Sequence, residues 1–251
     1  MIIFKLVLIY FCLAEVTSNP SALRERLSVP SFSQQDARNV GWTPRNAELR
    51  NVYIKLYMAN EVNKVALRNA FEFYEKNSCS SSVRSQSCCR NMSSQTLAIS
   101  DFTRASSENR LHLINLQTGT STNMLVAHGS GSDPDHDRRA QSFSNLANSN
   151  QTPAGFHIAR GQYMGSNGLS LNLHGLEPSR NGNSYRRRIV VHGASYVQSG
   201  GRSHGCLAVE PRNIRSVVEM LSNDSLVYNF NGEAAINANA TELCAGATGP
   251  Q

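Results

Sequence analysis

Residues 188–206 read RIVVHGASYVQSGGRSHGC and link a local fold to a chemistry more closely than any other stretch of the chain. The apolar run Ile189–Val191 leads directly into His192 and has the composition of a buried strand. The loop of residues 194–202, with two adjacent glycines, then leads back to Cys206. The pattern therefore predicts a strand that ends at a histidine, with a turn that presents a cysteine beside it.

A cysteine in this setting is a candidate nucleophile. A thiol with a pKa of about 8.5 is mostly protonated at neutral pH, so attack on a carbonyl needs a base and a site for the oxyanion. His192, fixed at a strand tip, is the candidate general base and Cys206 the candidate nucleophile. The backbone amides of residues 204–206 are candidate oxyanion donors. The residues assigned to oxyanion binding or to support of the turn are Gly193, Ser203, His204 and Gly205.

Other interpretations of the same residues remain open at this point. A lone cysteine is often an inert core residue, although polar neighbours such as Ser203 and His204 rarely surround a core thiol. A zinc site built from His192, His204 and Cys206, with His128 added, is the main rival. The sequence lacks the H-E-x-x-H and C-x-x-C spacings typical of such sites. We therefore expect neither a metal nor another cofactor.

The N-terminus has the pattern of a secretory signal peptide over residues 1–18. Lys5 precedes an apolar run that is shorter than the roughly 20 residues of a membrane span. We expect export to the periplasm or cell envelope, or secretion, with no stable membrane span. The net charge of +6 suits an anionic surface such as a cell-wall polymer, although ordinary solubility explains it equally well. The absence of a basic-aromatic motif in the sequence argues against a nucleic-acid partner.

Cysteine usage supports a free thiol at position 206. Of the six cysteines, Cys12 leaves with the predicted signal peptide, and an odd number remains. An oxidising compartment favours pairing, so one thiol is expected to stay free. The cysteines that could form two disulfides are Cys79, Cys88, Cys89 and Cys244. Their pairing would leave Cys206 unpaired.

The predicted secondary structure changes from helical to β-rich near residue 96. Residues 19–95 comprise a polar arm, a helical region over 46–76 with Asn60 as an N-cap within it, and a Ser- and Cys-rich loop. Residues 96–232 form a predicted β-rich domain, and 233–251 a flexible tail. This domain contains an expected hairpin turn at 117–119 and a helix that starts at Pro211. The expected strands are 96–99, 111–116, 124–127, 156–159, 169–173, 188–192 and 226–230.

The H-G and S-H-G-C motifs, at 192–193 and 203–206, resemble the signature of the L,D-transpeptidase (YkuD-type) catalytic domain. The likeness is closest to the branch described as murein L,D-transpeptidase catalytic domain-like, and it runs from about residue 96 to 231. Arg202 matches the first position of that branch's R-S-x-G-C ending. The other matching segments are TPAGF at 152–156, LVAHG at 125–129, FSN at 143–145 and GLEP at 175–178.

This resemblance implies a mainly β catalytic domain, a β-sandwich or barrel-like sheet, which with the N-terminal helical segment makes the chain α+β overall. It implies that Cys206 attacks the peptide bond after meso-diaminopimelate in a peptidoglycan stem and that His192 is the base. Terminal D-alanine leaves, and a neighbouring amine resolves the acyl-enzyme into a 3→3 crosslink or an attachment to the wall. We expect Arg202 to pair with a substrate carboxylate, and His128 either to face the site or to cap a strand.

Two positions depart from the family pattern and bear on substrate contacts. Leu207 follows the cysteine where the branch commonly has proline, and His174 stands where it commonly has an acidic residue. An L,D-carboxypeptidase or endopeptidase that uses the same thioester is one alternative function. A non-catalytic secreted wall-binding protein is another. The oligomeric state is not predicted.

Overall fold

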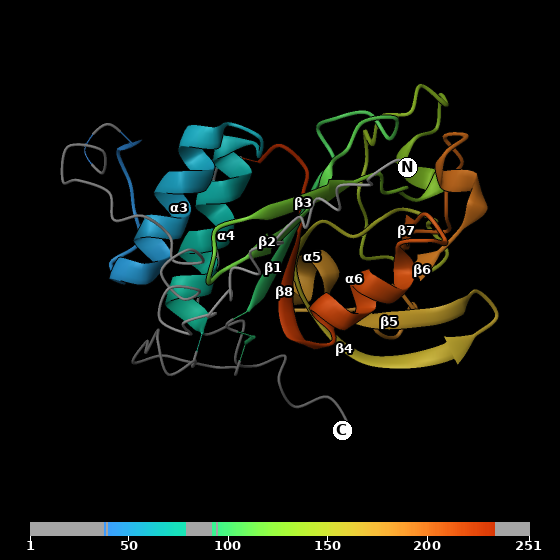
Figure 1. Cartoon of the computed structure of the whole chain (residues 1–251). Coiled ribbons are helices and arrows are strands. Elements are labelled where there is room, and N and C mark those ends of the chain that lie inside the picture. Colours follow the sequence, from blue (N-terminus) through green and yellow to red (C-terminus); the bar gives the residue numbers. More distant parts are fainter. Residues whose placement is uncertain (1–37, 39, 79–91, 94, 234–251) are drawn as a thin grey trace, which may run out of the picture.

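The computed structural model describes residue 38 and residues 40–78, 92–93 and 95–233. Helices α3 (Ala47–Ala59) and α4 (Lys64–Asn77) lie side by side next to a curved sheet (Figure 1). Shorter helical elements are α5 (Pro178–Asn181), α6 (Ile214–Leu221) and the 3₁₀ turns η1 (Ser130–Ser132) and η2 (Ser195–Val197). The strands are β1 (Thr96–Asp101), β2 (Leu111–Asn115), β3 (Ser121–Met124), β4 (Gly155–Gly165), β5 (Gly168–Gly175), β6 (Val190–Gly193), β7 (Leu207–Val209) and β8 (Asn223–Phe230).

Several sequence predictions fall on residues that lie outside the described ranges. These are the signal peptide at 1–18, the tail beyond residue 233 and most of the Ser- and Cys-rich loop. The four cysteines proposed to pair also lie there, so the disulfide pairing stays a prediction, as does the division of the chain at residue 96. Among the described residues, no helix has the length and apolar character needed to cross a bilayer.

Two asparagines decide where the N-terminal helices meet. Asn60 has a left-handed backbone with φ 56°, and its amide donates to Leu56 O, so it ends α3. Asn63 begins α4, because its side chain accepts hydrogen bonds from the amides of Val65 and Ala66. The prediction that Asn60 is an N-cap is therefore wrong, since a left-handed residue closes a helix and does not open one.

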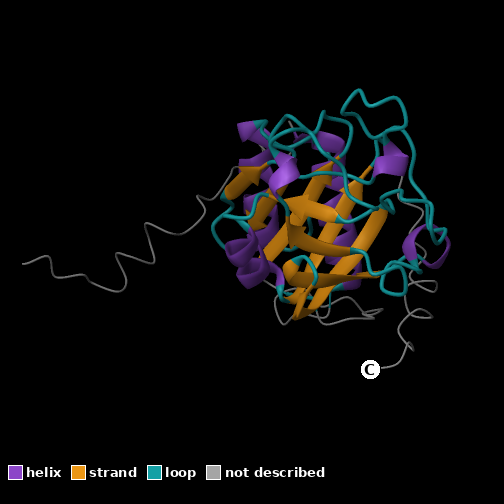
Figure 2. Cartoon of the chain, turned by 90° about the vertical axis from the view of Figure 1, so that its right-hand side faces the viewer, coloured by secondary structure: helices purple, strands orange, loops and turns teal. Residues whose placement is uncertain are grey.

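The eight strands form one mixed sheet in the order β3-β2-β1-β8-β4-β5-β6-β7. The β1–β8 and β6–β7 pairs are parallel and the others antiparallel. The chain leaving edge strand β3 crosses to the other edge, where the Ala127 amide donates to Ala208 O at 2.8 Å. This crossing nearly closes the sheet into a barrel, and Figure 2 shows loops gathered over its upper part. The predicted barrel-like, mainly β domain with N-terminal helices is confirmed.

Most of the expected strands and the β2–β3 hairpin are present. Three details differ. Residues 125–127 contribute only the isolated bridge at Ala127, and the short strand β7 was not predicted. The last helix begins at Ile214, because Pro211 lies in the turn before it and not at the first helical position.

The sheet has a hydrophobic cluster on each face. Leu97 and Ile99 of β1 pack with the helices, whereas Ala98 between them belongs to the cluster beneath α6. On the helical side, the Phe73 ring of α4 stacks on Phe156 of β4 with centroids 3.8 Å apart. Burying such a ring contributes about 1.5–3 kcal/mol. This packing anchors the middle strands of the sheet. Strands β6 and β7 lie at one edge, and they carry or adjoin the H-G motif at 192–193 and the S-H-G-C motif at 203–206.

Candidate active site

The parallel strands β6 and β7 bring His192 and Cys206 to the same face of the sheet. Val191 lies opposite Leu207 and His192 opposite Ala208, and Cys206 immediately precedes β7. Side chains two residues apart along a strand point the same way, so His192 and Cys206 both face away from the core that buries Val191. The strand that carries His192 and the turn that carries Cys206 therefore lie next to each other at this edge of the sheet.

Cys206 carries a free, partly exposed thiol. Its Sγ lies 3.5 Å from the carbonyl oxygen of Arg188, to which it donates a hydrogen bond. Burial raises the pKa of this thiol above its ordinary value, while the Val190 amide and the Arg187 guanidinium act in the opposite direction. Because burial is the largest effect, the thiol rests protonated at neutral pH and needs a base to become a nucleophile.

His192 is only 4% exposed, and its ring is held by its own strand. The Nδ1 atom lies 3.1 Å from the carbonyl oxygen of Gly193, a contact that a ring nitrogen makes as a donor. The other nitrogen, Nε2, therefore carries the lone pair of the neutral ring. Burial lowers the pKa of His192, with the Gly193 contact acting in the opposite direction. The imidazole is thus neutral at neutral pH, the form that accepts a proton.

The turn before Cys206 is held by Ser203. Its hydroxyl donates to Cys206 O at 2.7 Å and accepts from the Gly205 amide at 3.1 Å. Gly205 has φ +114°, and a Cβ there would come within 2.8 Å of Gln151 O, so the predicted strained turn requires glycine. Since the Gly205 amide is already engaged, the amides of His204 and Cys206 are the remaining candidates among the predicted oxyanion donors.

The backbone of Gly193 lies close to residues 211–214, in agreement with the close approach that a glycine at this position suggested. A Cβ at Gly193 would lie 3.3 Å from both the Pro211 Cα and the Ile214 Cγ2, at the start of helix α6. A larger residue here would push α6 away from the strand that holds His192. Gly193 therefore supports the site through packing.

His128 lies inside the protein. Its side chain is fully buried, Nδ1 lies 2.7 Å from Arg110 Nη2, and Nε2 lies 3.4 Å from Asp133 Oδ2. Burial, followed by the Arg110 charge, lowers the pKa of His128 to about 4. Its carbonyl oxygen accepts from the Ser203 amide at 2.9 Å, so His128 contacts the candidate site through its main chain.

The guanidinium of Arg202 is hydrogen-bonded to other residues of the protein. Nη1 donates to Asp133 O at 2.6 Å, and Nη2 donates to His136 Nδ1 at 3.0 Å. Both contacts tie Arg202 to the loop that follows η1. The expectation that Arg202 binds a substrate carboxylate remains a prediction, and these contacts give Arg202 a second role in holding that loop.

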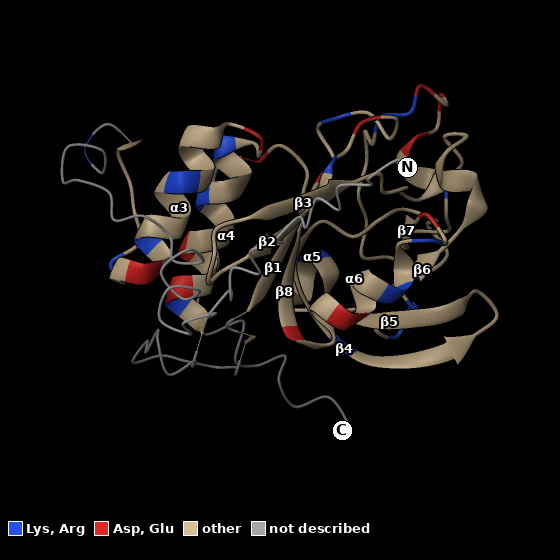
Figure 3. Cartoon of the chain, in the orientation of Figure 1, with Lys and Arg blue, Asp and Glu red and all other residues tan. Residues whose placement is uncertain are grey.

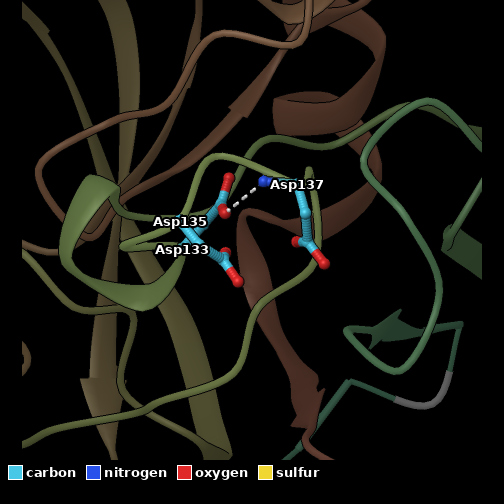
Figure 4. A group of neighbouring side chains, drawn as sticks. All are labelled: Asp133, Asp135 and Asp137. Atoms are coloured by element: carbon cyan, nitrogen blue, oxygen red, sulfur yellow. Dashed lines mark hydrogen bonds between the residues drawn. The ribbon is translucent and has the colours of Figure 1, made fainter.

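Three acidic side chains meet in the same loop (Figure 4). Asp133, Asp135 and Asp137 each offer an oxygen within 4.8 Å of the others, and Asp133 Oδ1 accepts from the Asp137 amide. Within the described part of the chain, this is the one such group that could hold a metal ion, so the rival zinc set around Cys206 does not assemble. Buried Asp133 already lies against the side chains of His128 and Arg202, and we assign no ion to the loop.

Two residues near the thiol were missed by the sequence analysis. The Arg187 side chain donates to Ser144 O and Gln151 O, which fixes the loop beside Gly205, and its charge acts on Cys206. Burial, and then the charge of ionised Cys206, raises the pKa of Tyr196 to about 12. Tyr196 therefore keeps its proton near the thiol. The arginine run directly before β6 was a visible signal, whereas nothing in the sequence marks Tyr196.

Two cavities share Arg186 and Arg188, and the first also reaches His204 in the turn before Cys206. One of about 330 Å³ is lined by Ala147, Asn148, Asn150, Arg186, Arg187, Arg188 and His204. The other, of about 420 Å³, is lined by Tyr163, Asn172, Tyr185, Arg186 and Arg188. Lysines and arginines also occur on the helices (Figure 3), so the basic character of the chain is not confined to these cavities.

Comparison with known protein families gives a match over most of the chain. The model of a family described as the L,D-transpeptidase catalytic domain matches residues 60–230. A search of the curated proteins found no match.

Solved structures give distant likenesses. An L,D-transpeptidase from Mycobacterium smegmatis is 14% identical, with a TM-score of 0.37 over 56% of this chain and 61% of that one. The helical cell shape determining protein Pgp2 from Campylobacter jejuni is 14% identical, with a TM-score of 0.39 over 82% and 62%. An L,D-transpeptidase from Xylanimonas cellulosilytica is 16% identical, with a TM-score of 0.33 over 78% and 90%. The matched region spans about three fifths of the first two structures.

Proposed function

The chain belongs to the L,D-transpeptidase catalytic domain family, and we propose that it transfers acyl groups between peptidoglycan stem peptides through a thioester on Cys206. One observation supports this proposal above the others. The Nδ1 of His192 is bound to Gly193 O, which leaves Nε2 as the proton acceptor on the face that also carries the free thiol. A base and a nucleophile with these protonation states suit general-base activation of the thiol.

In the first half of the proposed reaction, His192 Nε2 takes the proton of Cys206 while Sγ attacks the carbonyl carbon after meso-diaminopimelate. The carbonyl π electrons move to oxygen, and the amides of His204 and Cys206 are proposed to stabilise that oxyanion. When the intermediate collapses, the C–N bond breaks and the His192 proton goes to the departing nitrogen. D-Alanine leaves as a free amino acid, and the stem remains on Cys206 as a thioester.

In the second half, the amine of a neighbouring stem attacks the thioester carbonyl. His192 accepts the proton from that amine, and the C–S bond breaks as the new amide forms. The proton then returns to Sγ, which restores the resting thiol. The product is a 3→3 crosslink, and no cofactor takes part. Such a reaction places the protein in the cell envelope, in agreement with the expected export.

Mass spectrometry of the products formed from disaccharide-tetrapeptides tests this proposal. Purified protein is expected to convert them to dimers that have lost one D-alanine. Cys206→Ala should abolish turnover, and His192→Gln should lower it by a factor of about 10²–10⁴, the usual contribution of a general base. A melting temperature equal to the parent's would show that each variant is folded.

Exposure to a carbapenem provides a second, independent readout. A covalent mass increase on the peptide that contains Cys206 is expected in the parent and not in Cys206→Ala. Tripeptide products without dimers would show that water, and not a stem-peptide amine, resolves the same thioester. An absence of both turnover and acylation by the folded parent protein would contradict the proposed function.

A further inference from the structure

Two exposed arginines, Arg186 and Arg188, line both cavities, one of which also includes His204, two residues before Cys206. Arg186 Nη2 donates to Asn183 Oδ1 at 2.7 Å and forms no ion pair with any described residue. The Arg188 guanidinium has no hydrogen-bond or acidic partner among the residues that the structure describes. Two positive charges thus face the cavities without a protein carboxylate to balance them.

Three other arginines of this protein form ion pairs. Arg160 pairs with Asp224, Arg212 with Glu210, and Arg104 with Glu108 at 2.9 Å or less. At these three positions the guanidinium group has an acidic partner within the chain. The neighbouring positive charges at 186 and 188 repel each other and stay uncompensated, which favours an anionic ligand in the cavities that they line.

The position of Arg188 links this charge to the nucleophile. Its carbonyl oxygen accepts the hydrogen bond from Cys206 Sγ, so the guanidinium extends from the very residue that contacts the thiol. Arg188 also has φ +56°, a left-handed conformation that costs energy for a residue other than glycine. The buried Ile189 that follows fixes this backbone at the start of the strand.

We infer that Arg186 and Arg188 form a carboxylate-binding pair that selects stem peptides with free, unamidated carboxylates. The inference rests on the proposed function and adds a preference among its substrates. A planar guanidinium binds a carboxylate through two parallel hydrogen bonds. The two arginines can each bind a carboxylate in a separate cavity, or both can bind the same carboxylate. Arg187 differs from its neighbours, because its donors already hold the loop at residues 144–151.

Equilibrium binding to the Cys206→Ala protein tests this pair without requiring turnover. The probes are the tetrapeptide L-Ala-D-Glu-meso-diaminopimelate-D-Ala and the same peptide amidated at its D-Glu and diaminopimelate side carboxylates. The acidic form is expected to bind about tenfold more tightly, and added salt should reduce that preference. Arg186→Gln/Arg188→Gln in the same background should bind the two peptides equally, whereas the double lysine variant should keep part of the preference.

Arg215, an exposed arginine of α6 that lines neither cavity, is the matched control, and Arg215→Gln should leave the tenfold preference intact. Equal binding of both peptides by the Cys206→Ala protein, or a preference that survives the double glutamine change, would overturn the inference. Turnover by the parent protein is measured in parallel. Turnover without a preference for the acidic peptide would overturn the inference and leave the proposed function standing. A preference for the acidic peptide without turnover would support the inference and contradict the proposed function.

Discussion

The thiol of Cys206 donates to the main-chain carbonyl oxygen of Arg188, with Sγ and O 3.5 Å apart. A thiol in this position is stabilised in its protonated form, and burial acts in the same direction by raising its pKa. His192 has a lowered pKa for the same physical reason, burial of its charged form. The resting pair is therefore a neutral thiol and a neutral imidazole, and the thiolate forms only as the proton moves to His192.

This resting state predicts how Cys206 alkylation depends on pH. Only the thiolate reacts with iodoacetamide, so a raised pKa means slow alkylation at pH 7 and a rate that keeps rising above the ordinary pKa of about 8.5. The rate is followed by mass spectrometry of the peptide that contains Cys206, with glutathione in the same buffer as reference. A plateau that begins below pH 7 would instead indicate a preformed thiolate–imidazolium pair.

Arg187→Gln extends the same measurement. The Arg187 charge lowers the pKa of the Cys206 thiol, so its removal should move the alkylation profile to higher pH. Arg215→Gln, on the exposed face of α6, should leave the profile in place. An unchanged profile in Arg187→Gln would show that solvent screens this charge from the thiol.

Ser203→Ala tests whether the Ser203 hydroxyl stabilises the turn that precedes Cys206. The change removes the hydroxyl that bonds both Cys206 O and the Gly205 amide. We expect a loss of about 1–2 kcal/mol in the free energy of unfolding, typical of one or two hydrogen bonds, and slower carbapenem acylation of Cys206. Ser199→Ala, which removes an exposed hydroxyl bonded to Tyr196 O, is the control and should change neither quantity appreciably. Equal acylation rates in both variants would show that the turn holds its shape without Ser203.

The parts of the site that the sequence predicted are local. An apolar run before His192 makes a strand, and Gly205 allows a turn, because both depend on residues close together in the chain. The bond between Ala127 and Ala208 that nearly closes the barrel joins residues 81 positions apart, and no local pattern encodes it. The sequence prediction also placed an N-cap at Asn60, whereas Asn63 begins α4, because the backbone conformation of each asparagine decides which end of a helix it occupies.

The surroundings of the thiol were harder to predict for the same reason. Arg187 lowers the pKa of Cys206, and ionised Cys206 raises that of Tyr196, and the positions of both residues depend on how the loops pack. The expected role of Arg202 came from a motif, whereas the structure directs its guanidinium to Asp133 and His136. A motif identifies which residues occur together, but the hydrogen bonds of each side chain follow from the tertiary structure.

Acid should destabilise the fold through His157. This side chain is fully buried, and burial lowers its pKa to about 4, below the value of about 6.5 in an unfolded chain. Between these two values the unfolded state binds more protons, so the free energy of unfolding falls as pH falls, by up to about 1.4 kcal/mol per pH unit for this group. His128, also lowered to about 4, acts in the same direction.

His157→Gln separates the contribution of this histidine. Glutamine retains a polar partner for Ser184 Oγ, which lies 3.1 Å from His157 Nε2, but it does not titrate. Urea unfolding at pH 7, 6 and 5 should show a shallower loss of stability in the variant than in the parent, whatever its stability at pH 7. Identical slopes would mean that His157 protonates in the folded state without penalty.

The GLEP motif at 175–178 has a structural role that a glycine substitution can test. Glu177 Oε2 accepts a 2.6 Å hydrogen bond from the Phe156 amide, and Gly155 beside it has φ +94°. A Cβ at Gly155 would overlap Glu177 Oε2, whereas one at Gly168, with φ +73°, would meet nothing within 4 Å.

Gly155→Ala and Gly168→Ala therefore share the cost of a left-handed alanine, about 1–2 kcal/mol, and differ in the clash. We expect Gly155→Ala to lower the free energy of unfolding by about 2 kcal/mol more than Gly168→Ala, because displacing Glu177 leaves the buried Phe156 amide without its acceptor. Chemical denaturation of both variants measures this difference. Equal losses would show that Glu177 moves aside freely, and the motif would then need a role outside the fold.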